Sequence, residues 1–223
     1  MASFTLKSIQ YFLECTTPLG SVARYRRERR LLKKLREWER RGRILPMPHF
    51  GKQQVVLDHL RDFNIECFVE TGTYKGHMVY AVMRHVGCAY SIEIDPTLCR
   101  EAQRRFAGYA NVNILLGQSG DILPLILERL DQPCLFWLDA HYSGGSTGKS
   151  DLDTPILQEL DAILNHRDAD RDLILIDDAR CFTGQGDYPR IETVEAFIMG
   201  RQPSWEFAVK DDIIRAHARN RRT

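Results

Sequence analysis

Three features that would place a chain in a special class of protein are missing from this sequence. It has no apolar run long enough to span a bilayer, so we expect no membrane-spanning helix. Its six cysteines are scattered and never closely paired, which favours buried thiols in a reducing compartment over disulfides or a zinc site. Its formal net charge is only +1, so global charge gives no sign of nucleic-acid binding. No signal peptide is evident, and we expect a cytoplasmic protein.

The 223 residues are enough for one α/β domain with an appendage, which we place at residues 51–223 and 1–50. The appendage begins with a weakly amphipathic stretch, Ala2 to Glu14, and a predicted turn, Thr17 to Gly20. Residues 22–43 then carry eleven Arg or Lys against three Glu, with apolar residues close to one helical face. This basic helix either packs its apolar stripe on the main domain or on a second subunit, or offers a basic surface to an anionic membrane or a phosphorylated carrier. RNA binding is the third alternative, although no aromatic platform supports it.

Short apolar runs alternate with helical patterns from residue 54 onward. Such alternation predicts a doubly wound, mostly parallel sheet, and a C-terminal hairpin around Lys210-Asp211-Asp212 would add antiparallel strands. We expect seven strands in all. The predicted strands are Cys67–Glu70, Ala89–Ile94, Val112–Leu116, Leu135–Leu138, Leu173–Ile176, Trp205–Val209 and Ile213–Ala216. The predicted helices are Val55–Asn64, His77–Val86, Pro96–Tyr109, Asp121–Leu130, Pro155–Asn165 (capped by Thr154) and Ile191–Met199.

The stretch from Phe68 to Gly76 passes from a strand into a glycine-bearing turn and then a helix. In an open parallel sheet, this is where the backbone approaches a ligand beyond the carboxyl ends of the strands. An acid at the strand end, Glu70, would repel a pyrophosphate but suits a cationic or hydroxyl-rich ligand. The ammonium group of S-adenosylmethionine meets that requirement.

The other strand ends are polar as well. Glu93 follows the second strand, where a carboxylate can accept hydrogen bonds from both hydroxyls of a ribose. Gln118 and Ser119 follow the third strand and suit an adenine edge. Each such residue could instead cap a helix. Together they describe a nucleoside site.

A carboxylate cluster is predicted beside that nucleoside site. Asp139 ends the fourth strand and Asp177-Asp178 end the fifth, and neighbouring strands lie about 5 Å apart. Carboxylates this close repel one another unless they are protonated or bind a cation, and hard oxygen ligands select Mg²⁺ or Mn²⁺. His141 could take a proton from a metal-held hydroxyl, although it could also position the substrate, serve a structural role or act as a fourth metal ligand.

These residues resemble class I S-adenosylmethionine-dependent methyltransferases, which have a Rossmann-like fold. Within that group, Phe68 to Phe182 is similar to metal-dependent O-methyltransferases of the catechol and macrocin (macrolide-sugar) types. The matching motifs are Glu70, Gly72, Tyr74 and Gly76 in the first turn, Glu93 after the second strand, and Gly117, Ser119, Asp121 and Ile122 after the third. The resemblance implies cofactor binding by Glu70, Thr71, Gly72, Thr73, Tyr74, Gly76, Glu93, Ile94, Gln118, Ser119 and Asp139, and metal binding by Asp139, Asp177 and Asp178.

Two positions depart from these families. His141 stands where the sugar type has an aspartate assigned as the base, and Tyr142 stands where the catechol type has a lysine. The residues before position 50 lie outside the resemblance.

The stretch 143–150 nearly spells a phosphate-binding loop that ends in Gly-Lys-Ser. It does not follow its strand directly, and Pro155 prevents a regular helix from running through from Lys149. We therefore expect a lid over the substrate rather than a nucleotide site.

The sequence thus predicts an S-adenosylmethionine-dependent O-methyltransferase, Mg²⁺-assisted, with His141 as the base. Its acceptor would be a hydroxyl of a small molecule, and the resemblance suggests a sugar or glycosylated product. A metal-independent methyltransferase of the same fold, a phosphate-binding enzyme that uses Lys149, and a non-catalytic binding protein remain as alternatives. The partners we expect are the small-molecule acceptor, an anionic membrane at residues 22–43 and a second copy of the chain, but no nucleic acid.

Overall fold

The computed structural model describes residues 18–139 and 155–219. The predicted N-terminal helix, His141, the stretch 143–150 and the Thr154 cap lie outside these residues. The chain divides into two compact units, Met1–Lys52 and Gln53–Thr223, and the division falls inside helix α3 (His49–Asp62). None of the described helices is both long enough and apolar enough to cross a membrane.

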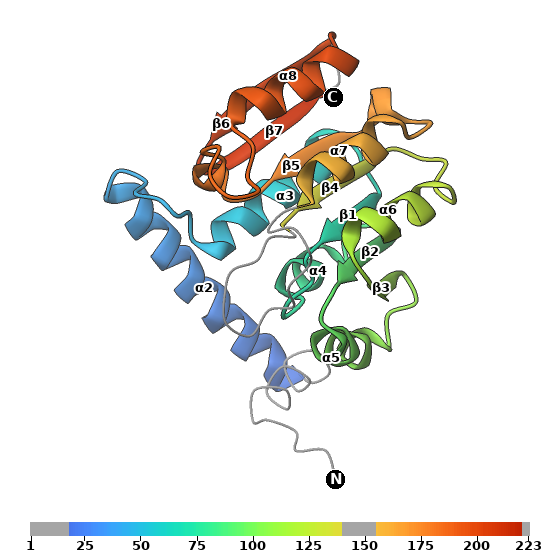
Figure 1. The fold of residues 1–223 in the computed structure, drawn as a ribbon. Coiled ribbons are helices and arrows are strands. Elements are labelled where there is room, and N and C mark those ends of the chain that lie inside the picture. The colour runs from blue at the N-terminus through green and yellow to red at the C-terminus, as the bar shows by residue number, and fades with distance from the viewer. Residues whose placement is uncertain (1–17, 140–154, 220–223) are drawn as a thin grey trace. The chain divides into compact units, whose positions relative to one another are not determined.

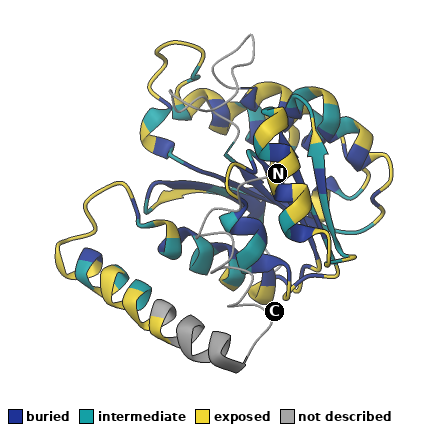
Figure 2. Ribbon diagram, turned by 90° about the horizontal axis from the view of Figure 1, so that it is seen from below, coloured by how far each residue is buried: buried dark blue, intermediate teal, exposed yellow. Residues whose placement is uncertain are grey.

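The first unit contains the basic helix α2 (Pro18–Arg40). The predicted turn at Thr17 to Gly20 is wrong, because the helix already begins at Pro18. Proline is favoured in the first turn of a helix, where its missing N–H costs no hydrogen bond. After the helix, the indole N–H of the buried Trp38 donates to the carbonyl of Ile44 (2.6 Å), and this contact anchors the chain as it leaves α2. The C-terminal part of α2, from Arg29 to Arg40, has mostly exposed residues (Figure 2).

The second unit is built on a seven-stranded sheet with the order β3-β2-β1-β4-β5-β7-β6 (Figure 1). The first five strands are parallel, and the C-terminal hairpin adds two antiparallel strands, as the sequence predicts. Every residue of β1, β4 and β5 is buried, which explains why β4 and β5 are short, continuous apolar runs and why β1 is apolar up to Glu70. The strands are β1 (Cys67–Thr71), β2 (Cys88–Glu93), β3 (Val112–Leu116), β4 (Cys134–Leu138), β5 (Leu173–Ile176), β6 (Trp205–Lys210) and β7 (Ile213–Ala218).

Helices cover both faces of this sheet, so the unit is doubly wound. One apolar cluster joins α6, α7 and α8 to alternate residues of the central strands, including Val69, Phe136 and Ile174. A separate cluster joins α4 and α5 to Ile114 of β3. The helices are α4 (His77–Val82), α5 (Pro96–Phe106), α6 (Ser119–Leu127), α7 (Ile156–Leu164) and α8 (Ile191–Arg201).

The seven predicted strands and the six helices predicted from residue 55 onward all occur, but several boundaries differ. Helix α4 ends at Val82 rather than Val86, and α6 begins at Ser119 rather than Asp121. The described cysteines are free thiols, and Cys67, Cys99 and Cys134 are buried in the core, as the scattered pattern suggests.

Candidate functional site

The glycine turn after β1 is held against β2 by main-chain hydrogen bonds. The N–H groups of Gly72 and Thr73 both donate to the carbonyl of Ile92 (3.0 and 3.1 Å). Gly76 closes the turn with a φ of 64°, and a Cβ there would lie 2.7 Å from a ring carbon of Phe106. Only glycine fits this position without strain, so the turn brings bare backbone to the edge of the sheet.

Glu93 stands beside this turn at the end of β2. One carboxylate oxygen accepts from the N–H of Tyr74 (2.6 Å) and the other from the N–H of Asp95 (2.9 Å). These two bonds fix the orientation of the carboxylate and tie the glycine turn to the second strand. Ile94 follows it and is half-buried.

Glu70 lies in β1 with only 2% of its surface exposed. Its carboxylate accepts a hydrogen bond from the Ser91 hydroxyl (2.5 Å), and the Thr73 hydroxyl lies 2.6 Å from that of Ser91. Burial raises the pKa of Glu70 well above its ordinary value, and the negative charges of Asp139 and Glu93 raise it further, against the opposing effect of Ser91. Glu70, Glu93 and Asp139 therefore form one electrostatically coupled group of acids.

The end of β3 joins the same edge of the sheet. The N–H of Gly117 donates to the carbonyl of Glu93 (3.0 Å), and Gln118 then serves as the N-cap residue of α6. Ser119 is the first residue of that helix and is buried. The predicted adenine-side residues thus lie directly beside Glu93.

The ends of β4 and β5 continue this edge on the other side of β1. The N–H of Asp139 donates to the carbonyl of Thr71, and the N–H of Asp177 donates to that of Leu138 (both 3.0 Å). The structure therefore brings together every predicted cofactor residue and all three predicted metal ligands along the carboxyl ends of the five parallel strands.

The predicted metal ligands have other partners, however. Asp177 accepts the N–H of Asp178 (2.7 Å), and Asp178 adopts a left-handed backbone with its carboxylate paired to Arg180 (2.7 Å). Within residues 18–139 and 155–219, no three acidic, histidine or cysteine side chains are arranged so that they could hold a metal ion. The described residues thus do not fit the predicted Mg²⁺ or Mn²⁺.

Three residues of this region were not assigned a role from the sequence. Ser91 faces Glu70 because the two are register partners in β1 and β2. Arg180 and Asp212 meet across 32 residues of chain. The predicted pairing of the first two strands could have revealed Ser91, whereas nothing in the sequence pattern links Arg180 to Asp212.

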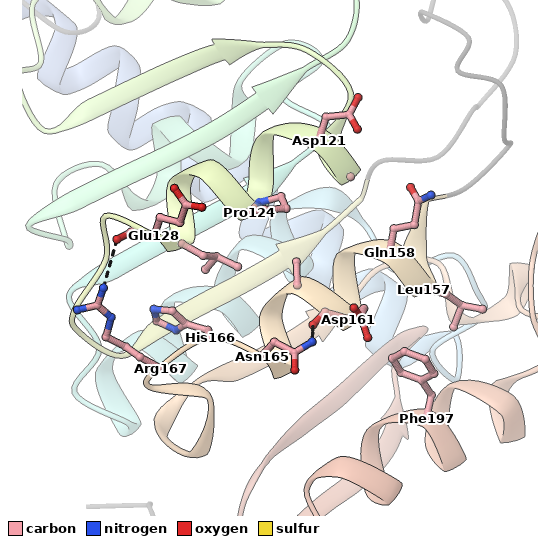
Figure 3. A pocket seen from close by; sticks show the side chains of 13 residues that line it. Asp121, Pro124, Glu128, Leu157, Gln158, Asp161, Asn165, His166, Arg167 and Phe197 are labelled. Atoms are coloured by element: carbon pink, nitrogen blue, oxygen red, sulfur yellow. Dashed lines mark hydrogen bonds between the residues drawn. The ribbon is translucent and has the colours of Figure 1, made fainter.

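A groove of about 900 Å³ lies elsewhere, along α6 and α7 (Figure 3). Its rim includes Glu128, Asp161 and Arg167, with Phe197 of α8 at one side. Arg167 donates to the main-chain carbonyl of Glu128 (3.2 Å) across it. None of the acids at the strand ends lines this groove.

No family model matches the sequence, and no curated protein matches it either. The structure is nevertheless similar to several solved methyltransferase structures. An O-methyltransferase from Bacillus cereus in complex with S-adenosylhomocysteine is 12% identical, with a TM-score of 0.56 over 95% of this chain and 97% of the other. The methyltransferase PaMTH1 from Podospora anserina, also bound to S-adenosylhomocysteine, is 16% identical with a TM-score of 0.53 over 99% of both chains. The O-methyltransferase TomG from Streptomyces achromogenes, in complex with S-adenosylmethionine, is 17% identical with a TM-score of 0.51 over 83% and 87%.

These likenesses, together with the strand order, define the fold of class I S-adenosylmethionine-dependent methyltransferases. At this level of identity they establish the fold alone.

Proposed function

We propose that the protein is an S-adenosylmethionine-dependent O-methyltransferase that acts on a hydroxyl of a small molecule. The observation that carries the proposal is the group of coupled acids Glu70, Glu93 and Asp139 beside a glycine turn at the strand ends. Glu70 is buried there, and no Arg, Lys or His of the part of the chain that the structure describes pairs with it. A ligand that carries positive charge would relieve the unfavourable environment of its carboxylate. The presence of S-adenosylmethionine or its product in solved structures of this fold supports the same assignment.

The chain's own residues would bind and orient the cofactor. Glu93 is held in place by two main-chain N–H groups and would accept hydrogen bonds from the ribose hydroxyls. Glu70 would favour the cationic end of the cofactor, and Gln118 and Ser119 would contact the adenine. The turn residues Thr71, Gly72, Thr73, Tyr74 and Gly76, with Ile94 and Asp139, would line the remaining surface.

When bound, the cofactor supplies a methyl group that passes to the acceptor oxygen as the carbon–sulfur bond breaks. The protein's main contribution would be to align oxygen and methyl carbon, since a positioned nucleophile needs little further help. The hydroxyl proton must pass to a base, and His141 remains our proposal for it. A sugar or glycosylated product remains the proposed acceptor by resemblance. Because the described acids do not fit a metal, we assign no step to Mg²⁺.

Calorimetric titration with S-adenosylhomocysteine tests the proposal without a known acceptor. Wild type should bind at micromolar concentration. Loss of two charge-assisted hydrogen bonds in Glu93→Ala, at about 1.5 kcal/mol each, should weaken binding by about 3 kcal/mol, or roughly 150-fold. Asp95→Ala is the matched control, because Asp95 contributes only its main-chain N–H to Glu93 and should leave binding unchanged. No binding to wild type at millimolar ligand would refute the proposal.

A peripheral contact with an anionic membrane through residues 22–43 is also proposed. The described basic side chains of α2 are exposed, and the chain beyond it presents Ile44 (68% exposed) and Leu45 (46%). Basic residues attract anionic headgroups, and exposed apolar side chains can enter the interface. Co-sedimentation with phosphatidylserine vesicles should be salt-sensitive and weakened in Ile44→Ser/Leu45→Ser. Sedimentation that is equal with neutral vesicles would contradict it.

A further inference from the structure

A guanidinium group already occupies the acidic cluster at the end of β5. Arg180 lies in the short 3-10 helix Ala179–Cys181, directly after the Asp177-Asp178 pair. Its Nη1 forms ion pairs with Asp178 Oδ1 (2.7 Å) and with Asp212 Oδ2. Its main-chain N–H donates to Asp212 Oδ1 (2.9 Å). Arg180 therefore pairs with two carboxylates at once, and one of them, Asp178, is a predicted metal ligand.

Asp212 fixes this arrangement from a distant part of the chain. It lies in the turn between β6 and β7 with a φ of 67°, and its side chain is fully buried. Its carbonyl accepts a further hydrogen bond from the N–H of Ala179 (2.9 Å). Both carboxylate oxygens of Asp212 are thus engaged by Arg180, and the hairpin turn clamps the segment that follows β5.

The clamp makes Arg180 difficult to displace. A buried carboxylate that loses its only cationic partner is strongly unfavourable, because it has left water and gains nothing in return. Among the described residues, no second Arg, Lys or His is paired with Asp212. Movement of the guanidinium would therefore leave Asp212 charged and buried, with only the main-chain N–H of Arg180 as a partner in the described part of the chain.

A divalent ion bound to Asp178 would lie close to the Arg180 guanidinium or would have to displace it. It would either lie beside a positive charge that already neutralises the carboxylate, or displace Arg180 at the cost just described. Asp177 would add little to the binding of such an ion, since one of its carboxylate oxygens already accepts the N–H of Asp178.

We propose that the Arg180 guanidinium, held in place by Asp212, is the resident cation of this acidic cluster and takes the place of a divalent metal. The inference rests on the function proposed above and specifies it: methyl transfer in this protein proceeds without bound Mg²⁺. Arg180 acts as a positioning residue that sets the charge of the cluster and the orientation of Asp178. About 38% of its side chain is exposed, so this charge also faces the solvent beyond the strand ends.

The inference is tested by Mn²⁺ binding to the full chain saturated with S-adenosylhomocysteine. The electron paramagnetic resonance signal of the free ion measures this binding. Wild type should show no saturable binding at millimolar Mn²⁺. The double variant Arg180→Gln/Asp212→Asn removes the guanidinium and the buried charge together while it keeps groups that can hydrogen-bond. It should bind Mn²⁺ saturably with a dissociation constant at least about tenfold below the millimolar concentration at which wild type does not bind. A further Asp178→Asn substitution should abolish this binding.

The ion pair of Arg171 with Asp168 provides the matched control. It precedes β5 at the opposite end of the strand, so Arg171→Gln/Asp168→Asn should not gain Mn²⁺ binding. Saturable wild-type binding that is lost in Asp178→Asn would overturn the inference, and so would a folded double variant that gains nothing.

Two further measurements keep the outcome clear. Should the double variant fail to fold, Arg180→Lys retains the charge and should resemble wild type in Mn²⁺ binding, whereas a gain of binding there would overturn the inference. The titration with S-adenosylhomocysteine tests a different proposal. If wild type does not bind this ligand, the methyltransferase assignment is contradicted, while the Mn²⁺ measurement still decides which cation occupies the acidic cluster.

Discussion

A buried histidine–aspartate pair at the amino-terminal ends of β4 and β5 should contribute strongly to stability and not to ligand binding. His166 Nδ1 lies 2.8 Å from Asp172 Oδ2, and His166 Nε2 lies 3.1 Å from the carbonyl of Leu130. Asp172 Oδ1 accepts the N–H of Cys134 (2.8 Å). The side chains of His166 and Asp172 are only 1% and 0% exposed. The pair thus joins the start of β4 to the start of β5, at the opposite end of the sheet from Glu93.

Asp172→Ala should lower the free energy of unfolding by about 3–5 kcal/mol, because it leaves the Cys134 N–H and a buried imidazole without their partner. For a chain of this length, that corresponds to a fall in Tm of about 6–20 °C. Urea denaturation should measure the loss. The exposed Asp170→Ala is the control and should change stability by less than about 0.5 kcal/mol. A loss below about 1 kcal/mol in Asp172→Ala, or an equal loss in the control, would refute the reasoning.

In the conservative variant Asp172→Asn, the loss of stability relative to wild type should depend on pH. An amide can accept from Cys134 and donate to His166 Nδ1, but only while the imidazole is neutral. Burial is the largest single influence on the pKa of His166 and lowers it. The hydrogen bond and the negative charge of Asp172, together with the Leu130 carbonyl and the charge of Asp168, outweigh burial, so the pKa is raised overall. The ion pair therefore stabilises the wild type fully below the ordinary histidine pKa of about 6.5, and this contribution is lost as pH rises through the raised value. The stability gap between wild type and Asp172→Asn should accordingly be wider in mild acid than at high pH. Burial raises the pKa of Asp172, and its protonation should close the gap again at lower pH. A gap that widens from mild acid to high pH would contradict the assigned charges.

Three further predictions concern the candidate site. The pKa of Glu70 is raised in the folded state, so its contribution to the free energy of unfolding is full below the ordinary carboxyl pKa and is lost as pH rises through the raised value. In urea titrations without ligand, Glu70→Gln should therefore gain stability relative to wild type as pH rises. Gly76→Ala should lose about 1–3 kcal/mol, because a Cβ would meet Phe106 at a positive φ, whereas Gly108→Ala, with open space around it, should not. Asp95 caps α5 by accepting two main-chain N–H groups, so Asp95→Ala should cost about 1 kcal/mol in thermal unfolding without weakening S-adenosylhomocysteine binding.

Local features of the sequence were sufficient to predict most of the fold. The central strands β1, β4 and β5 are short, mainly apolar runs because both of their faces are buried, and the hairpin is marked by Lys210-Asp211-Asp212 between two apolar segments. Where the alternatives were locally balanced, the prediction was less reliable. Pro18 is compatible with a turn and with the first residue of a helix, and the structure has the helix.

The gathering of the strand-end acids at the candidate site also followed from the sequence. Parallel strands end at one edge of a sheet, so an acid after each of several strands must meet the others there. This rule correctly grouped Glu70, Glu93 and Asp139, since it needs only the strand boundaries and not the details of packing.

The partners of those acids were decided by the tertiary structure. Ser91 reaches Glu70 through the register of β1 on β2, and the register depends on the whole sheet. Arg180 meets Asp212 only because the hairpin folds back beside β5, 32 residues further along the chain. A sequence therefore shows which charges gather at a strand end, whereas the cation that neutralises them depends on contacts between segments that no local pattern connects.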